Sequence, residues 1–373
     1  HGKTRFTHGR CTGWPSTMKL LGYRLEKRVE VSPLWQFLSA LLALAIAFAV
    51  SAVLIAFAGA NVGEAFLAMA RGSVGSTSAF AETIVQATPL ILTGLAVTVA
   101  FRGRLWNIGA EGQFFAGAMA VFWASAILPN LPALAMGMWV FSAAILAGSI
   151  WGAIPAFLKA RFGSNEVIVT VMMNFIIHFI LSYLLSGPWQ DPASSFLQTA
   201  KFPATANFSR LITGTRIHLG LGIALVTAVV VWFLLWKTTL GYEIRAYGIN
   251  ALASKFKGIP PMRTIILTLA ISGAIAGLAG ASEVTGLHGR LRLDISTGYG
   301  FTGIIVALLG RLHPVGVILA AIVMGALVNG SLAMQITSGV PIAMAFVIRG
   351  VVLVALLTVE VLAQYRIRRH IDG

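Results

Sequence analysis

Long apolar runs separated by short polar loops restrict this chain to very few folds. Several runs approach the roughly 20 residues that an α-helix needs to cross about 30 Å of hydrocarbon. Of the 373 residues, 57% are hydrophobic and only 10% are charged, whereas a soluble domain carries roughly a quarter charged residues. Because helices satisfy every backbone hydrogen bond internally, these runs predict an all-α, polytopic transmembrane helix bundle.

The apolar runs define about ten predicted spans. They cover residues 34–58, 84–102, 111–129, 133–156, 166–186, 217–236, 263–282, 301–312, 314–334 and 341–363. The run at 301–312 is too short to cross alone, so we expect it to continue a broken or re-entrant segment.

The distribution of basic residues predicts the orientation of the spans. The net charge of +15 would suggest nucleic acid in a soluble protein, but here the basic residues lie mostly in short loops. With the amino end inside, the cytoplasmic segments hold 17 Lys and Arg and the outer segments hold 6. We therefore predict two cytoplasmic termini and no nucleic-acid partner. The first and second groups of four spans would then run in opposite senses, which favours an inverted repeat.

The predicted transmembrane domain covers residues 34–365, between an N-terminal segment at 1–33 and a short tail at 366–373. Residues 1–17 contain no apolar run, and they are interpreted either as an upstream extension or as a native polar tail. Arg349 lies deep in the predicted last span, where a charged side chain needs a partner that the sequence does not identify.

No motif for nucleotide hydrolysis or metal binding occurs in the sequence. The patterns GxxxxGK[ST], HExxH and GxSxG are all missing. The single cysteine, Cys11, excludes an intrachain disulfide framework and a cysteine metal cluster. We predict that the chain is not an enzyme and binds no metal or cofactor, so active transport would need ATP hydrolysis on another chain.

The polar segment Gly241–Pro261, GYEIRAYGINALASKFKGIPP, separates two long apolar runs. Its glycines at 241, 248 and 258 bracket short helical pieces, and basic residues occur throughout. We predict that it docks a soluble partner, and the alternative is a regulatory loop.

Three places supply polar residues within membrane depth, where such groups usually face protein or water at functional sites. The pathway or gate candidates are Asn107, Glu111 and Gln113 from RGRLWNIGAEGQ at 102–113, Asn174 and His178 from the fifth span, and Glu283 at the end of the seventh.

Each of these places also has a structural interpretation. The 102–113 segment could be a cytoplasmic hairpin, with Glu111 near a helix N-terminus. The fifth span carries a polar stripe at four-residue spacing that interhelical hydrogen bonds would explain: Glu166, Thr170, Asn174, His178, Ser182 and Ser186. Glu283 could pair with Arg290 or Arg292 at the outer interface.

Three stretches give the chain a family resemblance: RGRLWNIGAEGQ at 102–113, IRAYGINALASKFKGI at 244–259 and GYGFTGIIVALLGRLHPVG at 298–316. The chain resembles the membrane permease subunits of bacterial ABC importers, in the branch that serves nucleosides and simple sugars. In the second stretch that branch commonly has Pro and Ala where Ala251 and Ser254 stand, and at Arg349 it would have an uncharged polar residue.

The resemblance implies a multi-pass protein of the bacterial cytoplasmic membrane that forms the pathway for a nucleoside or related sugar-containing solute. It implies a second permease subunit, in a homo- or heterodimer, and cytoplasmic ABC ATPase subunits that bind ATP and magnesium. It also implies an extracytoplasmic substrate-binding protein. The residues that would lie on the ATPase-coupling element are Glu243, Arg245, Gly248, Asn250, Lys255 and Gly258. An ion-coupled secondary transporter and a passive channel are the alternatives.

Overall fold

The computed structural model describes residues 17–339 except 21–22, 28–32, 58 and 209, together with scattered residues between 344 and 369. Arg349 and residues 1–16 lie outside the described residues, as does much of the predicted last span at 341–363. The chain divides into two compact units, one formed by residues 1–62 and 340–373 and the other by residues 63–339.

The first unit contains α1 (Pro33–Phe57) and a three-stranded antiparallel sheet. β1 (Thr17–Leu20) pairs with β2 (Tyr23–Lys27), which also pairs with β3 (Tyr365–Arg369). The sequence predicted no strand at either place, because runs of 4 or 5 residues are too short to show a reliable period of two.

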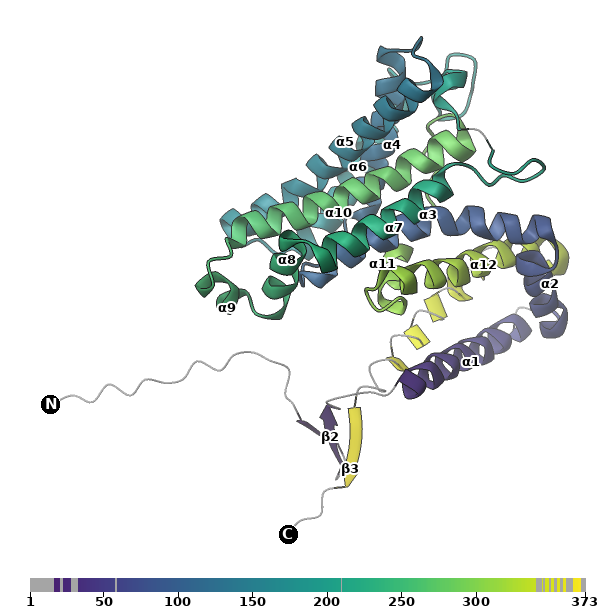
Figure 1. Ribbon diagram of the computed structural model, residues 1–373. Helices are drawn as coiled ribbons and strands as arrows, with labels where there is room; N and C mark the ends of the chain where they lie inside the picture. The colour runs from purple at the N-terminus through teal and green to yellow at the C-terminus, as the bar shows by residue number, and fades with distance from the viewer. Residues whose placement is uncertain are drawn as a thin grey trace. The chain divides into compact units, whose positions relative to one another are not determined.

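The second unit, which we call the helical unit, contains α2 to α12 and two short helical turns (Figure 1). Its elements are α2 (Val62–Val74), α3 (Thr77–Arg102), α4 (Ala110–Ile127), α5 (Ala133–Phe162), α6 (Glu166–Leu185), η1 (Ala204–Ala206), α7 (Gly220–Lys237), α8 (Thr239–Ile249), α9 (Ala251–Phe256), α10 (Pro261–Glu283), η2 (Val284–His288), α11 (Tyr299–Leu309) and α12 (Pro314–Ser338).

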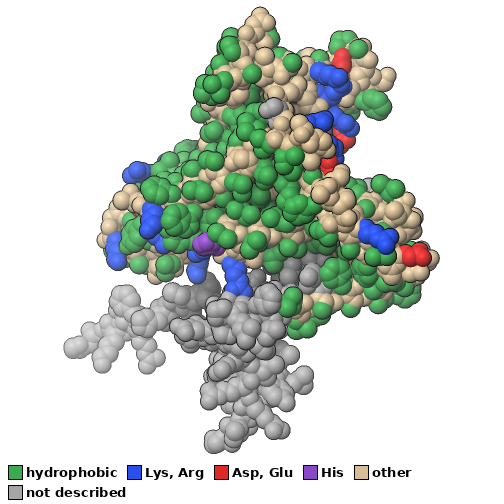
Figure 2. Space-filling model, turned by 45° about the vertical axis from the view of Figure 1, so that its right-hand side comes forward, with side chains coloured by type: hydrophobic (Ala, Val, Ile, Leu, Met, Phe, Trp, Pro, Cys, Tyr) green, Lys and Arg blue, Asp and Glu red, His purple; other side chains and the backbone are tan. Residues whose placement is uncertain are grey.

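Six of the described helices are long and apolar enough to cross a membrane, and they make the chain a multi-pass membrane protein. They are α3, α5, α6, α7, α10 with η2, and α12. Hydrophobic side chains cover the broad middle of the surface in Figure 2, and charged side chains gather towards its margins. This distribution suits a protein surrounded by lipid at mid-height.

The described residues show the membrane bundle and six of the ten predicted spans. The predicted spans at 111–129 and 301–312 correspond to α4 and α11, which are not among the six, whereas those at 34–58 and 341–363 lie partly outside the described residues. α3 starts at Thr77, seven residues before the predicted 84, because Ser76 caps it by accepting a hydrogen bond from the Ala79 N–H at 3.0 Å. The inverted repeat remains a prediction.

α3 and α10 form the centre of the helical unit. In the most apolar window of each helix, 83% of α3 and 67% of α10 is buried, more than in any other of the six. α3 packs against α7, α10, α11 and α12, and α10 packs against α3, α4 and α5. A helix that is apolar on all sides is expected at such a central position.

Glycines allow α10 to approach its neighbours backbone to backbone. Gly273 of α10 faces Gly148 of α5, and Gly277 faces Gly117 of α4. A Cβ atom at any of these four positions would overlap backbone atoms of a neighbouring helix, which for Gly277 is α5. Small residues at helix contacts are the usual way in which membrane helices pack closely, since lipid offers no hydrophobic drive for association.

We predict that Gly273→Val forces α10 away from α5. Overpacking of this kind costs about 1–3 kcal/mol, so the melting temperature of the detergent-solubilised protein should fall. The matched control is Gly222→Val on α7, where a Cβ meets nothing within 4 Å. Thermal melts followed by size-exclusion chromatography would test this, and equal melting temperatures for the two variants would contradict the packing argument.

Candidate functional site

Two helices, α4 and α11, have their starts next to each other inside the helical unit, and Glu111 joins these starts. We call them the interrupted helices. α4 begins at Ala110 and α11 begins at Tyr299. The Gly300 N–H donates to Glu111 Oε2 at 2.6 Å, so a carboxylate from the first turn of α4 satisfies a donor at the start of α11. Both helix starts carry partial positive charge, which favours a carboxylate between them.

The start of α11 is also fixed to α3. Thr93 Oγ1 donates to the Tyr299 carbonyl at 3.0 Å, and the Tyr299 hydroxyl donates to Gln86 Oε1 at 2.9 Å. Thr93 and Gln86 lie well inside α3. α11 therefore starts part-way along the bundle and does not reach from one end to the other.

Asn107 organises a buried hydrogen-bond network just before α4. Its Nδ2 donates to Gln113 Oε1 at 2.9 Å and to Ser272 Oγ at 2.8 Å. Its Oδ1 accepts the Gly109 N–H at 3.0 Å. Ser272 Oγ in turn donates to the Ala96 carbonyl at 2.6 Å. The network ties the connection before α4 to α3 and α10.

Asn174 of α6 holds the same connection from the other side. Its Oδ1 accepts the Gly112 N–H at 2.8 Å, and its Nδ2 donates to the Ile108 carbonyl at 2.9 Å. The nearby Trp151 Nε1 is buried without a hydrogen-bond partner among the described residues. The structure thus brings together four of the six predicted pathway residues: Asn107, Glu111, Gln113 and Asn174.

The polar stripe of α6 does not stay on one side of the bundle. Glu166, Thr170 and Asn174 are buried, whereas His178 and Ser186 are exposed. Each four-residue step advances the helix by about 400°, so three steps turn the stripe by about 120°. The His178 ring contacts Phe115 edge to face, with 5.8 Å between ring centroids.

Glu283 lies apart from the Asn107 network. It is eleven residues after Ser272 on the same helix, or roughly 16 Å along the axis. The predicted pairing of Glu283 with Arg290 or Arg292 is wrong, because the carboxylate lies 3.5 Å from His288 Nε2 and Arg292 pairs with Asp294. The single turn of π-helix that follows α10 carries His288 to this position.

A buried histidine that the sequence analysis did not single out lies at the same end of the bundle as Glu283. His218 Nδ1 accepts the Gly220 N–H at 3.1 Å, and Nε2 has no partner among the described residues. The glycines Gly220 and Gly286 pack directly on the ring. Burial lowers the pKa of His218 to about 4, so the imidazole is neutral at pH 7.

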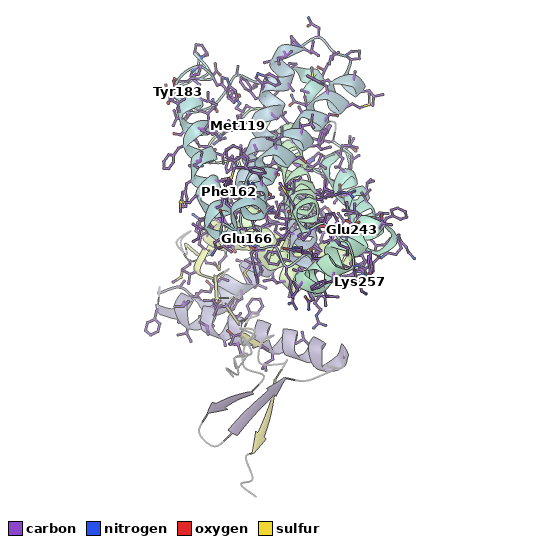
Figure 3. All side chains as sticks on the ribbon, turned by 90° about the vertical axis from the view of Figure 1, so that its left-hand side faces the viewer. Met119, Phe162, Glu166, Tyr183, Glu243 and Lys257 are labelled. Atoms are coloured by element: carbon purple, nitrogen blue, oxygen red, sulfur yellow. The ribbon has the colours of Figure 1, made fainter. Side chains whose placement is uncertain are left out.

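The segment 241–261 folds into short helices at the opposite end, which we call the α8 end. Thr238 caps α8 by accepting the Gly241 N–H at 3.1 Å, and Asn250 caps α9 by accepting the Ala253 N–H at 3.0 Å. Gly258, two residues after α9, has φ of +83°. Glu243 and Lys257 lie at the same end of the bundle as Glu166, whereas Tyr183 lies towards the other end (Figure 3).

α8 packs on the end of α3 and near the start of α6. Gly248 is buried against the backbone of Arg102 and Gly103, where no Cβ would fit. Burial, with the nearby Glu166 carboxylate, raises the pKa of Tyr247. Glu166 itself pairs with Lys159 at 2.5 Å.

The outer side of α8 and α9 forms an open groove of about 380 Å³. Its lining residues are Tyr242, Arg245, Ala246, Ile249, Asn250, Ala253, Ser254 and Lys257. Large apolar side chains are exposed here: Ile249, in the lining, is 77% accessible, and Phe256 of α9 is 85% accessible. Among the described carboxylates, none lies within ion-pair distance of Arg245 or Lys257.

Of the predicted coupling residues, Arg245 and Asn250 line this groove. Gly248 contacts α3, and Lys255 is exposed on α9. Glu243 Oε2 is buried without a hydrogen-bond partner in the described part of the chain. The sequence analysis missed Ser272 and Trp151, since a lone serine or tryptophan inside an apolar run gives no signal of its partner.

Comparison with known proteins identifies the family of this chain. Residues 79–357 match the family described as "Branched-chain amino acid transport system / permease component". A guanosine ABC transporter permease protein of Bacillus subtilis is 41% identical over 317 residues, covering 83% of this chain and 90% of the relative.

Two further relatives cover similar lengths. A glucose ABC transporter permease protein of Haloferax volcanii is 36% identical over 82% of this chain and 82% of its own length. A nucleoside ABC transporter permease protein of Lactococcus lactis is 33% identical over 81% of this chain and 85% of the relative. The chain therefore belongs to the family of permease components of branched-chain amino acid transport systems, as a transport subunit of the ABC type.

Proposed function

We propose that this chain forms the translocation pathway of an ATP-driven importer for a nucleoside or a related sugar-containing solute. The observation that carries the proposal is the surface of α8 and α9, which offers an open groove, exposed apolar side chains and basic groups without acidic partners among the described residues. Such a surface suits a protein partner that supplies carboxylates and an apolar face. In an ABC transporter, that partner is the ATPase.

The same proposal orients the chain in the membrane. The excess of Lys and Arg at the α8 end favours a cytoplasmic location for this end, and with it two cytoplasmic termini in the bacterial cytoplasmic membrane. ATP and magnesium would bind to the ATPase subunits. A second permease subunit and an extracytoplasmic binding protein complete the proposed complex.

The solute class follows from the relatives and fits the polar groups inside the bundle. Two of the compared permeases serve guanosine or nucleosides and one serves glucose, and all these solutes carry sugar hydroxyls. We propose that Asn107, Glu111, Gln113, Asn174 and His178 line or gate the pathway, with Glu283 at its outer part. Trp151 Nε1, buried without a partner among the described residues, is a donor that a solute hydroxyl could use.

Reconstitution tests this function directly. Proteoliposomes that hold this chain with its ATPase and binding protein should accumulate radiolabelled guanosine only when ATP is present on the side of the membrane that carries the ATPase subunits. The chain alone should accumulate none, with or without a proton or sodium gradient. Concentrative uptake by the chain alone would establish the ion-coupled transporter instead, and downhill flux without ATP would establish the channel.

The coupling surface gives a second prediction. Gly248→Glu places a side chain against the Arg102 carbonyl, and Arg245→Glu reverses a charge that lines the groove. Each should lower ATP-dependent uptake about tenfold or more while the membrane helices stay folded in detergent, with α8 displaced from the end of α3 in Gly248→Glu. The control is Arg263→Glu, the same charge change at an exposed residue outside the groove. Full uptake by both variants, with ATPase bound, would show that the surface is not the coupling element.

The pathway residues give a third prediction, because the structure separates two neighbours on α6. Asn174→Leu leaves the Gly112 N–H and the Ile108 carbonyl unpaired, so it should destabilise the fold by about 1–3 kcal/mol for each orphaned group. His178→Leu removes an exposed ring, so it should leave the melting temperature unchanged and reduce the uptake rate. Unchanged uptake in His178→Leu would remove this residue from the pathway.

A further inference from the structure

Arg102, the last residue of α3, contacts three other elements at the α8 end. Its Nε donates to the Leu312 carbonyl at 3.0 Å, in the turn between α11 and α12. Its guanidinium carbon lies 5.0 Å from the centre of the Trp236 ring, at the end of α7. Its own carbonyl faces Gly248 of α8. A planar guanidinium can stack and donate at the same time, which an ammonium cannot do.

The turn that Arg102 holds is strained. Arg311 and Leu312 both have φ of +54°, a left-handed conformation that favours glycine. Two hydrogen bonds tie the turn to the last part of α11, from the Arg311 N–H to the Leu308 carbonyl at 2.9 Å and from the Leu312 N–H to the Ala307 carbonyl at 2.8 Å. Such strain persists only where the surroundings fix the backbone, so the bond from Arg102 fixes the end of α11.

Both interrupted helices are attached to Arg102. The chain that follows it, residues 103–109, carries Asn107 and leads directly into α4. α11 is held at its end by the Leu312 carbonyl and at its start by the Glu111 carboxylate. A displacement of Arg102 would therefore act on α4 through the main chain and on α11 through a side-chain hydrogen bond.

We propose that Arg102 is the positioning residue that transmits a displacement of α8 to the two interrupted helices. The inference rests on the proposed function, since it takes α8 as the element that the ATPase moves. Gly248 lies directly on the Arg102 backbone, so a rigid-body shift of α8 moves the end of α3 without intervening side chains. The bond to Leu312 then carries the shift to α11.

The test uses the reconstituted complex with radiolabelled guanosine as the probe. Arg102→Met removes the donor to the Leu312 carbonyl, the charge and the stack on Trp236. It is expected to keep ATPase binding and ATP hydrolysis while uptake per ATP hydrolysed falls about tenfold or more. Arg104→Met is the matched control, since Arg104 is exposed two residues further on, and it should stay within about twofold of wild type. Wild-type uptake per ATP in Arg102→Met would overturn the proposal.

A second readout does not depend on the solute. Cys11 is the single cysteine, so Thr297→Cys in a Cys11→Ser background gives one thiol, at an exposed position just before α11. Vanadate-trapped nucleotide should change the rate of maleimide labelling at this thiol, and adding Arg102→Met should abolish the change. If the change persists with Arg102→Met, the proposal fails and the coupling function stands.

The remaining outcomes are also decisive. If trapped nucleotide changes nothing in the parent thiol variant, the coupling function fails, and the role of Arg102 fails with it. If Arg102→Met does not assemble, Arg102→Lys replaces it, and we expect uptake per ATP to fall about threefold, because one ammonium cannot both stack on Trp236 and reach Leu312. Full coupling with Arg102→Lys would overturn the proposal.

Discussion

The hydrogen bond between the Gly300 N–H and the Glu111 carboxylate is the contact on which the interior of the helical unit depends. A helix start exposes backbone donors that have no partner within the helix, and in a membrane bundle no bulk water can satisfy them. α11 can begin part-way along the bundle because a side chain from another helix start meets this need. The carboxylate also lies in the first turn of α4, so one group stabilises two helix starts of positive partial charge.

The close packing of α10 makes this interior possible. Gly273 and Gly277 bring the α10 backbone against α5 and α4. At that separation Ser272, next to Gly273, reaches both Asn107 and the Ala96 carbonyl. Larger residues would increase the distance between the helices and leave these buried polar groups unpaired. An unpaired buried polar group destabilises the fold, whereas a lost apolar contact leaves no such group behind.

Residues 102–109 connect α8, the helix that carries much of the groove, with the polar interior. Gly248 touches the first residues of this stretch, and Asn107 lies near its other end. This arrangement gives a surface element a short physical connection to the two interrupted helices. Rigid helices joined by a few fixed contacts can move as bodies, so a partner bound at the groove need not deform the bundle.

Local patterns in the sequence were enough for part of this description. Hydropathy predicted the membrane bundle and a broken or re-entrant segment at 301–312, and glycines predicted short helices in 241–261. The local sequence did not reveal which distant groups meet: Glu111 and Gly300 are 189 residues apart, and Asn107 and Ser272 are 165 apart. The partner of Glu283 was predicted wrongly for the same reason, since the π-turn that presents His288 has no clear local signal.

The sequence by itself determined that the chain spans a membrane as helices, because the length and polarity of each run decide whether it is stable in lipid. The tertiary structure alone decided which polar residues form one network and which face outward. Helix periodicity shows which residues of α6 share a side, but it does not show which side faces the bundle interior. The packing of neighbouring helices decides this, and it buries Asn174 and exposes His178.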